Sequence, residues 1–425
     1  MTFCNEGCNS YDGIVYLTAK LYDAIVKGKE MPELLAEELY KFNPWWEADS
    51  YQPDFIPRPN YTDYLQKNLD NADIVILTGI RRVGKTTLMK LLITELLKTV
   101  EPRFIFYASL DSLTLEKFAI SELLREYRKI HSLRLADKVF LFFDEVAYRP
   151  KIHQELKNLY DTEKLKIFAS SSSTSILRDT RGLLTGRARF MEVLPLDFTE
   201  YLSFKKVQPR VAERYLLEKH FEEYMRTGGI PEFVLTGDVS YLDNLIESVI
   251  HKDIVAFHGI RDVSGIKDFF RLLMERAGKP FTISKVAKIL GGSPDTMRRY
   301  LDFFAQTFLV YTIERCGKLN ERLRSPKKLY AADVGIRNHV TGYRDKGAIF
   351  ENLVFLKIKH KNPCYVQKNG TELDFLAEGM LFEVKLESEF TAKQKALFDS
   401  FKAKKKTLIQ GLDDFLNLDQ MVKLT

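Results

Sequence analysis

The feature of this sequence that most constrains its fold is a single glycine-flanked loop. Residues Gly79 to Thr86 read G-I-R-R-V-G-K-T and follow the apolar run Ile74 to Leu77. In a loop of the G-x-x-x-x-G-K-[ST] pattern, the glycines let successive main-chain N–H groups point inward at a phosphate chain, and the lysine adds a positive charge. The pattern therefore predicts a strand, a phosphate-binding loop and a helix, in that order.

The residues of this loop also predict how a nucleotide is held. The helix that begins at Thr86 directs its positive N-terminal end at the loop, and its leucines recur with helical spacing. We expect Lys85 to contact the phosphates and Thr86 to bind Mg²⁺ through its hydroxyl. A chance glycine-rich turn is the alternative, and the strand before the loop and the helix after it argue against that. The predicted ATP-binding residues are Gly79, Ile80, Arg81, Arg82, Val83, Gly84, Lys85, Thr86, Thr87 and Asp144.

A second motif supplies acids. The run Val139 to Phe143 consists of five apolar residues and is followed by Asp144 and Glu145. A buried strand of a parallel sheet delivers such residues at its carboxyl end. We expect Asp144 to bind Mg²⁺ through its water shell and Glu145 to polarise the water that attacks the γ-phosphate. The alternative is an ordinary Asp-Glu pair that caps a helix.

Two further elements belong to this interpretation. The strand Lys166 to Ala169 is followed by four serines, Ser170 to Ser173, one of which could sense the γ-phosphate, although the sequence does not indicate which one. Downstream, Arg187 and Arg189 are available to stabilise transition-state charge, and Arg187 is the candidate finger, from the same or a neighbouring subunit. An arginine acting between subunits implies a homo-oligomer. The alternative is that both arginines are solvated surface residues.

The C-terminal region carries a second constellation. Residues Glu372 to Lys385 read E-L-D-F-L-A-E-G-M-L-F-E-V-K, with Glu378-Gly379 as a two-residue turn between alternating strands. If Ala377 lies opposite Met380, counting back along each strand places Asp374 opposite Glu383 on one face. Lys385 then points to the same side, because side chains alternate along a strand.

Asp followed by Glu-x-Lys is the arrangement of PD-(D/E)XK nucleases, in which the acids hold Mg²⁺ at the scissile phosphate and the lysine orients or activates water. Glu351 heads an otherwise apolar helical stripe and is a third candidate ligand; Gln394, on the following helix, carries little weight. The predicted catalytic residues here are Asp374, Glu383 and Lys385, and the predicted metal ligands are Glu351, Asp374 and Glu383. A solvent-facing charged hairpin, or a fold that has become a docking module, is the alternative.

Between these regions the sequence has a helix-turn-helix outline. Phe281 to Leu290 and Asp295 to Phe304 flank a Gly-Gly-Ser-Pro break, and Arg298 and Arg299 are expected to be exposed. The outline and the following apolar run resemble a winged helix. The basic cluster Arg322, Arg324, Lys327 and Lys328 is expected to be a solvated face.

Most of the chain resembles a known family, the prokaryotic, largely archaeal AAA+-type ATPases with a C-terminal PD-(D/E)XK nuclease-like domain. The resemblance is carried by N-P-W-W at Asn43, the phosphate loop, F-F-D-E at Phe142, L-P-L-D-F-T-E-Y at Leu194, G-G-I-P-E at Gly228 and K-D-I at Lys252. One departure is Ala169-Ser170, where the family usually has Thr-Gly. The resemblance implies an ATPase core and a restriction-endonuclease-like C-terminal fold.

Bulk properties limit the remaining possibilities. No apolar run reaches the roughly 18 residues that cross a bilayer, so we expect a cytoplasmic protein with no membrane partner. Four cysteines without a CxxC pair predict neither a disulfide framework nor a zinc site. The net charge of +6 permits a polyanionic partner without requiring one.

We therefore expect an α/β protein in five parts: a helical extension and linker at 1–60, a P-loop core with a parallel sheet at 61–205, a helical part at 206–275, a winged-helix-like part at 276–327 and a nuclease-like domain at 328–425. The expected function is ATP hydrolysis that drives or gates a metal-dependent nuclease-like domain acting on DNA. The alternative is an ATP-dependent switch whose C-terminal domain does not cleave.

Overall fold

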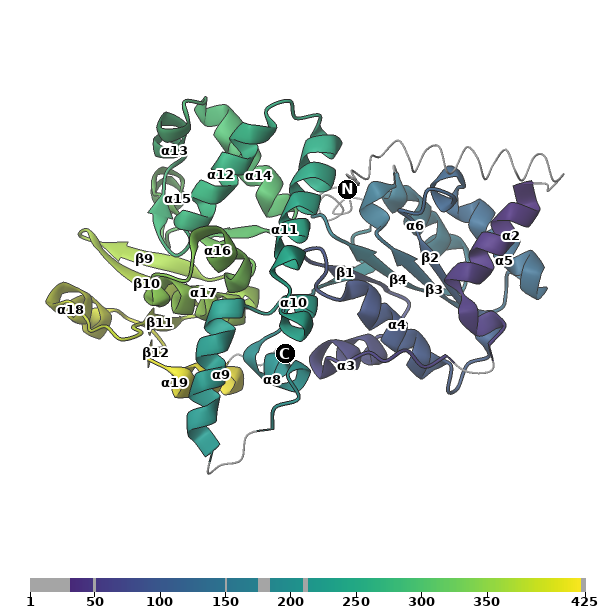
Figure 1. Ribbon diagram of the computed structural model, residues 1–425, viewed down its shortest axis with the longest axis horizontal. Helices are drawn as coiled ribbons and strands as arrows, with labels where there is room; N and C mark the ends of the chain where they lie inside the picture. The colour runs from purple at the N-terminus through teal and green to yellow at the C-terminus, as the bar shows by residue number, and fades with distance from the viewer. Residues whose placement is uncertain (1–30, 49–50, 150, 175–183, 209–212, 422–425) are drawn as a thin grey trace, which may run out of the picture. The chain divides into compact units, whose positions relative to one another are not determined.

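The structure is a computed structural model that describes residues 31–48, 51–149, 151–174, 184–208 and 213–421 (Figure 1). Residues 1–30 of the expected helical extension lie outside the described residues. Two compact units make up the chain. The first comprises Met1–Ile76, Thr86–Ser171 and Asp179–Phe190, and the second comprises Leu77–Lys85, Ser172–Arg178 and Met191–Thr425.

The expected alternation of strands and helices forms one five-stranded sheet with the order β2-β3-β4-β1-β5. Its interior strand β3 pairs in parallel with β2 on one side and with β4 on the other. All residues of β1 and β3 are buried, as expected for strands that are covered on both faces. The strands are β1 Ile74–Thr78, β2 Ile105–Ser109, β3 Val139–Asp144, β4 Leu165–Ser171 and β5 Ala188–Glu192.

Helices surround the phosphate loop in the sequence, as expected. The helical extension expected within 1–60 contributes α2, and α4 begins at the end of the phosphate loop. The α-helices are α2 Met31–Phe42, α3 Pro59–Lys67, α4 Lys85–Leu96, α5 Ile120–His131 and α6 Ile152–Thr162, and the short 3₁₀ turns are η1 Pro44–Trp46, η2 Pro102–Phe104, η3 Leu115–Lys117 and η4 Val146–Tyr148.

The N-P-W-W motif covers the free edge of this sheet. β2 is an edge strand, and the buried Asn43 side chain accepts from the Tyr107 N–H at 2.6 Å and donates to the Tyr107 carbonyl at 2.9 Å. Trp45 and Trp46 both donate their indole N–H groups to the Ile105 carbonyl. The motif thus satisfies backbone groups that would otherwise be unpaired at a sheet edge.

The second unit begins with a helical part. Its elements are α8 Phe198–Phe204, α9 Arg214–Thr227, α10 Pro231–Thr236, α11 Val239–Ser248, the π-helix η6 Val249–Ala256 and α12 Val263–Glu275.

The G-G-I-P turn is the point where α9 meets a buried acid. The Asp333 carboxylate accepts from the N–H groups of Gly229 at 2.6 Å and Ile336 at 3.0 Å. A Cβ at Gly228 would lie 2.3 Å from that carboxylate, and a Cβ at Gly229 would lie 2.2 Å from the Leu196 carbonyl oxygen. Both glycines are therefore required by close approach. Burial raises the pKa of Asp333 to about 6, against the effect of these N–H groups.

A three-stranded antiparallel sheet with the order β6-β8-β7 follows. The two expected helices are present, with Leu301 and Phe304 buried and Arg298 and Arg299 exposed as predicted. The expected boundary between 327 and 328 falls inside β8. The elements are β6 Pro280–Phe281, α13 Ile283–Leu290, α14 Pro294–Gln306, β7 Val310–Ile313, α15 Leu319–Arg324 and β8 Lys327–Ala331.

The C-terminal part is a four-stranded sheet with the order β12-β11-β10-β9. Figure 1 shows α18 beside this sheet, where it contacts β10. The predicted hairpin register is confirmed, because Ala377 pairs with Met380 and Phe375 with Phe382. The elements are α16 Val334–Thr341, α17 Lys346–Ile358, η7 Lys359–Lys361, β9 Cys364–Lys368, β10 Thr371–Ala377, β11 Met380–Val384, α18 Ala392–Ser400, β12 Lys405–Ile409 and α19 Leu412–Met421.

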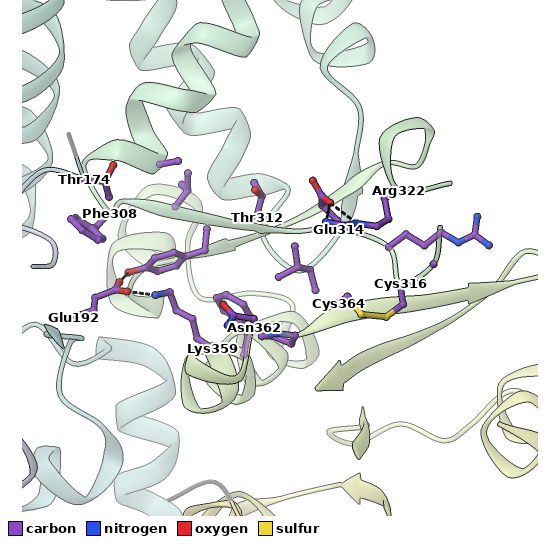
Figure 2. Close-up of a pocket in the computed structure, with 18 residues that line it drawn as sticks. Thr174, Glu192, Phe308, Thr312, Glu314, Cys316, Arg322, Lys359, Asn362 and Cys364 are labelled. Atoms are coloured by element: carbon purple, nitrogen blue, oxygen red, sulfur yellow. Dashed lines mark hydrogen bonds and ion pairs between the residues drawn. A yellow bond between two sulfur atoms is a disulfide. The ribbon is translucent and has the colours of Figure 1, made fainter. Parts of the chain in front are cut away.

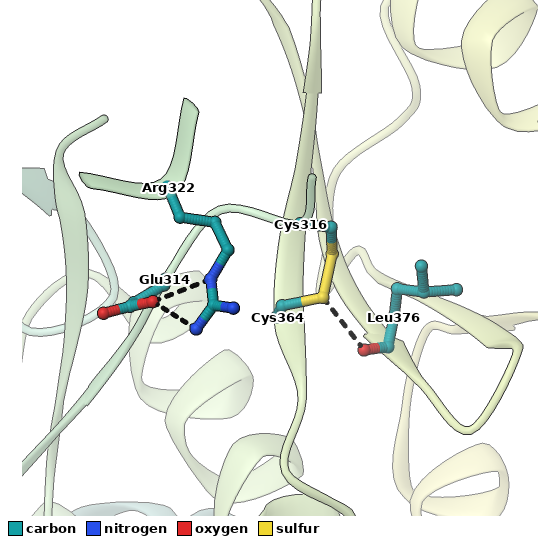
Figure 3. The surroundings of a disulfide bond; sticks show 5 residues. All are labelled: Glu314, Cys316, Arg322, Cys364 and Leu376. Carbon is teal, nitrogen blue, oxygen red and sulfur yellow. Dashed lines mark hydrogen bonds and ion pairs between the residues drawn. A yellow bond between two sulfur atoms is a disulfide. The ribbon is translucent and has the colours of Figure 1, made fainter. Parts of the chain in front are cut away.

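The expectation of no disulfide is wrong. Cys316 and Cys364 form a disulfide across 48 residues of sequence. The main chain brings them together, since the Cys316 N–H donates to the Tyr365 carbonyl at 2.7 Å and the Tyr365 N–H donates to the Glu314 carbonyl at 3.1 Å. Figure 3 shows the bond between the segment after β7 and the start of β9. Cysteine spacing could not predict this pairing, which depends on tertiary contacts.

Among the described residues, no helix is long and apolar enough to span a bilayer.

Replacing Asn43 by alanine is expected to destabilise the first unit by about 2 to 4 kcal/mol, because it leaves the buried N–H and carbonyl of Tyr107 without partners. The chain has two tryptophans, Trp45 and Trp46, so their fluorescence in urea reports on this unit. Lys41→Ala, at an exposed ion pair on the same segment, is the control and should change stability by less than about 0.5 kcal/mol. Equal effects of the two substitutions would contradict the edge-covering role.

The Asp333 carboxylate makes the second unit pH-dependent. Its folded pKa lies above the unfolded value of 3.8, so its contribution to stability is fully present below about pH 3.8 and is lost as pH rises through about 6. Between pH 4.5 and 7.5 the wild type should lose about 2 kcal/mol more stability than Asp333→Asn, which keeps a good helix cap. Urea unfolding followed by circular dichroism tests this, and parallel pH profiles would refute it.

Candidate functional site

The phosphate loop has the backbone that its sequence predicts. Gly79, Arg82 and Gly84 have φ of 138°, 66° and 97°, in the region that favours glycine. A Cβ at Gly79 would lie 2.3 Å from the Val193 carbonyl oxygen, so no larger residue fits there. The buried Lys85 Nζ donates to the carbonyls of Gly79 at 2.9 Å and Ile80 at 3.1 Å. The ammonium group is therefore held over the loop itself, as a phosphate-binding lysine requires.

Two arginines of the loop bind the helical part of the second unit. Arg81 Nε donates to Asp253 Oδ2 at 2.6 Å, and the Arg82 guanidinium lies 4.7 Å from the Tyr241 ring centre. Asp253 belongs to the π-helix η6, a conformation that often marks functional sites. The sequence offered only K-D-I as a motif and gave no reason to pair Asp253 with Arg81. These side chains fix the loop to helices that follow it by more than 150 residues.

The Asp144 carboxylate accepts hydrogen bonds from three hydroxyl groups of the first unit. Its Oδ2 accepts from Thr86 Oγ1 at 2.5 Å and from Tyr107 Oη at 2.8 Å, and its Oδ1 accepts from Ser170 Oγ. Burial, followed by the charge of Asp144, raises the pKa of Tyr107, so this hydroxyl stays a proton donor. The Thr86 hydroxyl and the Asp144 carboxylate thus lie together, as expected for the two protein groups that hold Mg²⁺ in such a site.

Glu145 and Ser170 complete this arrangement. Glu145 has a left-handed backbone, with φ of 52° and ψ of 49°, and its N–H donates to Ser170 Oγ at 3.0 Å. A non-glycine residue in this region costs free energy and is held there by its surroundings. Among the serines that the sequence left unresolved, Ser170 contacts both Asp144 and Glu145, so its hydroxyl is a sensor candidate.

The two arginines after the fourth strand make ion pairs within the first unit. Arg187 Nε donates to Asp161 Oδ1 at 2.8 Å, and Arg189 pairs with Asp73. Both contacts are at the surface. The role of Arg187 as an arginine finger stays a prediction.

The C-terminal acids are buried and face one another. The Asp374 N–H donates to Glu383 Oε2 at 3.1 Å, and the Val384 N–H donates to Asp374 Oδ2 at 2.9 Å. Glu383 is completely buried and Asp374 is 8% exposed, so this hairpin face is not the wet surface of the alternative interpretation. Lys385 Nζ donates to Glu383 Oε1 at 2.6 Å, on the predicted side.

The expectation that Lys328 is solvated is wrong, because this residue is 1% exposed. Its Nζ lies 2.7 Å from Glu351 Oε1, 2.9 Å from Glu372 Oε1 and 3.4 Å from Asp374 Oδ1. Glu351 also accepts from Tyr330 Oη at 2.7 Å. The run of basic residues at 322–328 indicates only a charged surface. In the structure Lys328 lies on β8, where side chains alternate between the two faces of the strand, and its side chain points inward.

The environment of Glu351 and Glu383 opposes their ionisation. Burial, and then the charge of Asp374, raises the pKa of both carboxyl groups above the usual value. Within the described ranges, no group of three or more His, Cys, Asp or Glu side chains is arranged to hold a metal ion. A three-carboxylate site does not fit this geometry, whereas Asp374 and Glu383 remain a two-carboxylate candidate.

Gln394 forms a capping box with Thr391 at the start of its own helix, α18.

A cavity of about 750 Å³ lies in the second unit beside the disulfide (Figure 2). The two carboxylates in its lining already form ion pairs, Glu192 with Lys359 and Glu314 with Arg322, as Figure 2 shows. Nothing in this lining selects a ligand class.

Comparison with known proteins assigns the first part of the chain. Residues 71–202 match the family described as "AAA domain", and residues 218–347 match a "Domain of unknown function (DUF8612)". The P-loop core is therefore similar to an AAA domain over these residues. The second match crosses the expected boundaries after 275 and 327, in agreement with the continuity of β8.

Two relatives similar over most of this chain are uncharacterised proteins. An uncharacterised protein of Methanocaldococcus jannaschii is 29% identical over 77% of this chain and 79% of its own length, and one of Haemophilus influenzae is 25% identical over 76% and 84%. Among solved structures, the Aeropyrum pernix ORC2 protein has a TM-score of 0.37 at 11% identity, covering 72% of this chain and 96% of that one. A similarity of that size transfers nothing to this chain.

Proposed function

We propose that this protein hydrolyses ATP with Mg²⁺ and uses the nucleotide cycle to drive or gate its C-terminal acid cluster on DNA. The observation that carries the proposal is the hydrogen bond from Thr86 Oγ1 to Asp144 Oδ2, because it places the last residue of the phosphate loop against the acid at the end of β3. Lys85, the preceding residue, neutralises phosphate charge, and bound Mg²⁺ supplies the Lewis acid that offsets the developing charge on the γ-phosphate.

The remaining residues have distinct roles in this proposal. Glu145 orients and polarises the attacking water, and Ser170 connects its main chain to Asp144. Arg187 acts on the nucleotide of a neighbouring copy in a homo-oligomer. In the C-terminal part, Asp374 and Glu383 hold a divalent cation at a DNA phosphate, and Lys385 orients water.

A second function, from another class, is supported by a specific observation. Both lysines of the C-terminal cluster are already paired with its acids, and three acids there do not surround one metal position. This arrangement favours an ATP-dependent switch in which nucleotide binding, read out by Arg81 and Asp253, reorganises the helical part. The C-terminal part then binds a protein or a nucleic acid without cutting it.

The ATPase proposal predicts two different defects. Lys85→Ala should abolish binding of a fluorescent ATP analogue, because the loop loses its phosphate-binding charge. Glu145→Gln should retain binding and lower kcat by at least about 100-fold, because only water activation is removed. The control for both is Lys98→Ala, which removes an exposed ion pair just after the end of α4. Wild-type turnover in Glu145→Gln would rule out the role of this residue.

The nuclease proposal predicts that purified protein with Mg²⁺ or Mn²⁺ cleaves branched, single-stranded or duplex DNA. Asp374→Ala should remove the cleavage, and Asp399→Ala, an exposed acid on the neighbouring helix α18, should not. ATP hydrolysis without any DNA cleavage, unaffected by added DNA, would instead support the switch.

A further inference from the structure

An ammonium group occupies the position between acids that the sequence assigns to a metal ion. Lys328 Nζ lies within 3.4 Å of carboxylate oxygens of Glu351, Glu372 and Asp374. In a Mg²⁺ site, carboxylate oxygens approach the metal to about 2.0 to 2.1 Å from several directions. A dication cannot bind Glu351 and Asp374 at the same point as this ammonium, because the two positive charges would repel each other at contact distance.

The position of Lys328 in the fold holds its side chain in place. Lys328 lies on β8, the middle strand of its sheet, and pairs with Pro280 on one side and with Ile313 on the other. The next residues along the strand, Leu329 and Tyr330, are completely buried. A lysine buried in this way cannot extend its charge to solvent, so it needs the carboxylates as partners.

The cluster contains more carboxylates than ammonium groups. Four carboxylates, those of Glu351, Glu372, Asp374 and Glu383, face two ammonium groups. Lys328 is shared among three acids, and Lys385 pairs with Glu383. Asp374 and Glu383 are joined through the main chain, because the Val384 N–H donates to Asp374 and the Asp374 N–H donates to Glu383.

We propose that Lys328 is a built-in cation of this cluster, which holds Glu351 and Glu372 in place of a metal ion and leaves one divalent cation to Asp374 and Glu383. Lys328 and Glu351 are then positioning residues, since they orient Asp374 without binding the metal. The proposal rests on the proposed metal-binding role of Asp374 and Glu383, and it removes Glu351 from the metal ligands that the sequence predicts.

The test is calorimetric titration of Mn²⁺ into the full-length, nucleotide-free protein, with no DNA present. The double variant Asp374→Asn/Glu383→Gln gives the baseline for binding elsewhere, and circular dichroism verifies the folding of each variant. Glu351→Gln should leave the Mn²⁺ affinity within about twofold, whereas Asp374→Asn should weaken it by at least about tenfold. A tenfold loss in Glu351→Gln would overturn the proposal, because Glu351 would then be a metal ligand.

Lys328→Met tests the built-in cation directly. Its neutral side chain of similar length should allow a second Mn²⁺ to bind, or tighten the first by at least about tenfold, and adding Glu351→Gln should abolish that gain. Mn²⁺ binding in Lys328→Met but not in the wild type would support the built-in cation and refute the nuclease proposal. Mn²⁺ binding that Lys328→Met leaves unchanged, including none in either protein, would overturn the built-in cation. If Lys328→Met does not fold, the Glu351→Gln result decides.

Discussion

The first unit depends on one carboxylate. Asp144 receives hydroxyl groups from Thr86 at the start of α4, from Tyr107 on β2 and from Ser170 on β4. These elements converge on β3 because parallel strands place their carboxyl ends at one edge of a sheet. A buried carboxylate is costly unless it is hydrogen-bonded, so the contacts that stabilise Asp144 also fix the first residue pair of the proposed metal site.

The same carboxylate links this site to the N-terminal motif. Tyr107 donates its hydroxyl to Asp144, while both its backbone groups are paired with the buried side chain of Asn43. The motif covers an edge strand. By binding the backbone of Tyr107, it also fixes the position of the tyrosine whose hydroxyl contacts Asp144. A feature that resembles a family signature therefore has a structural reason within the first unit.

In the second unit, buried charge has a comparable role. Asp333 is held by N–H groups at the glycine turn, and Lys328 is held by acids from α17 and β10. Both residues lie on or just after β8, so this strand carries one acid and one base into the interior. Buried groups of this kind fix a single arrangement of their neighbours, because any other arrangement would leave a charge without a partner.

The sequence by itself determined the features that depend on local pattern. The phosphate loop, the acidic end of β3, the hairpin register and the burial of Leu301 and Phe304 follow from glycine spacing, apolar runs and side-chain alternation, which act over a few residues. Only the tertiary structure decided the rest: the Arg81–Asp253 pair, the Cys316–Cys364 disulfide and the inward position of Lys328. Each of these joins residues far apart in the chain, and no short-range pattern specifies which distant partners the fold brings into contact.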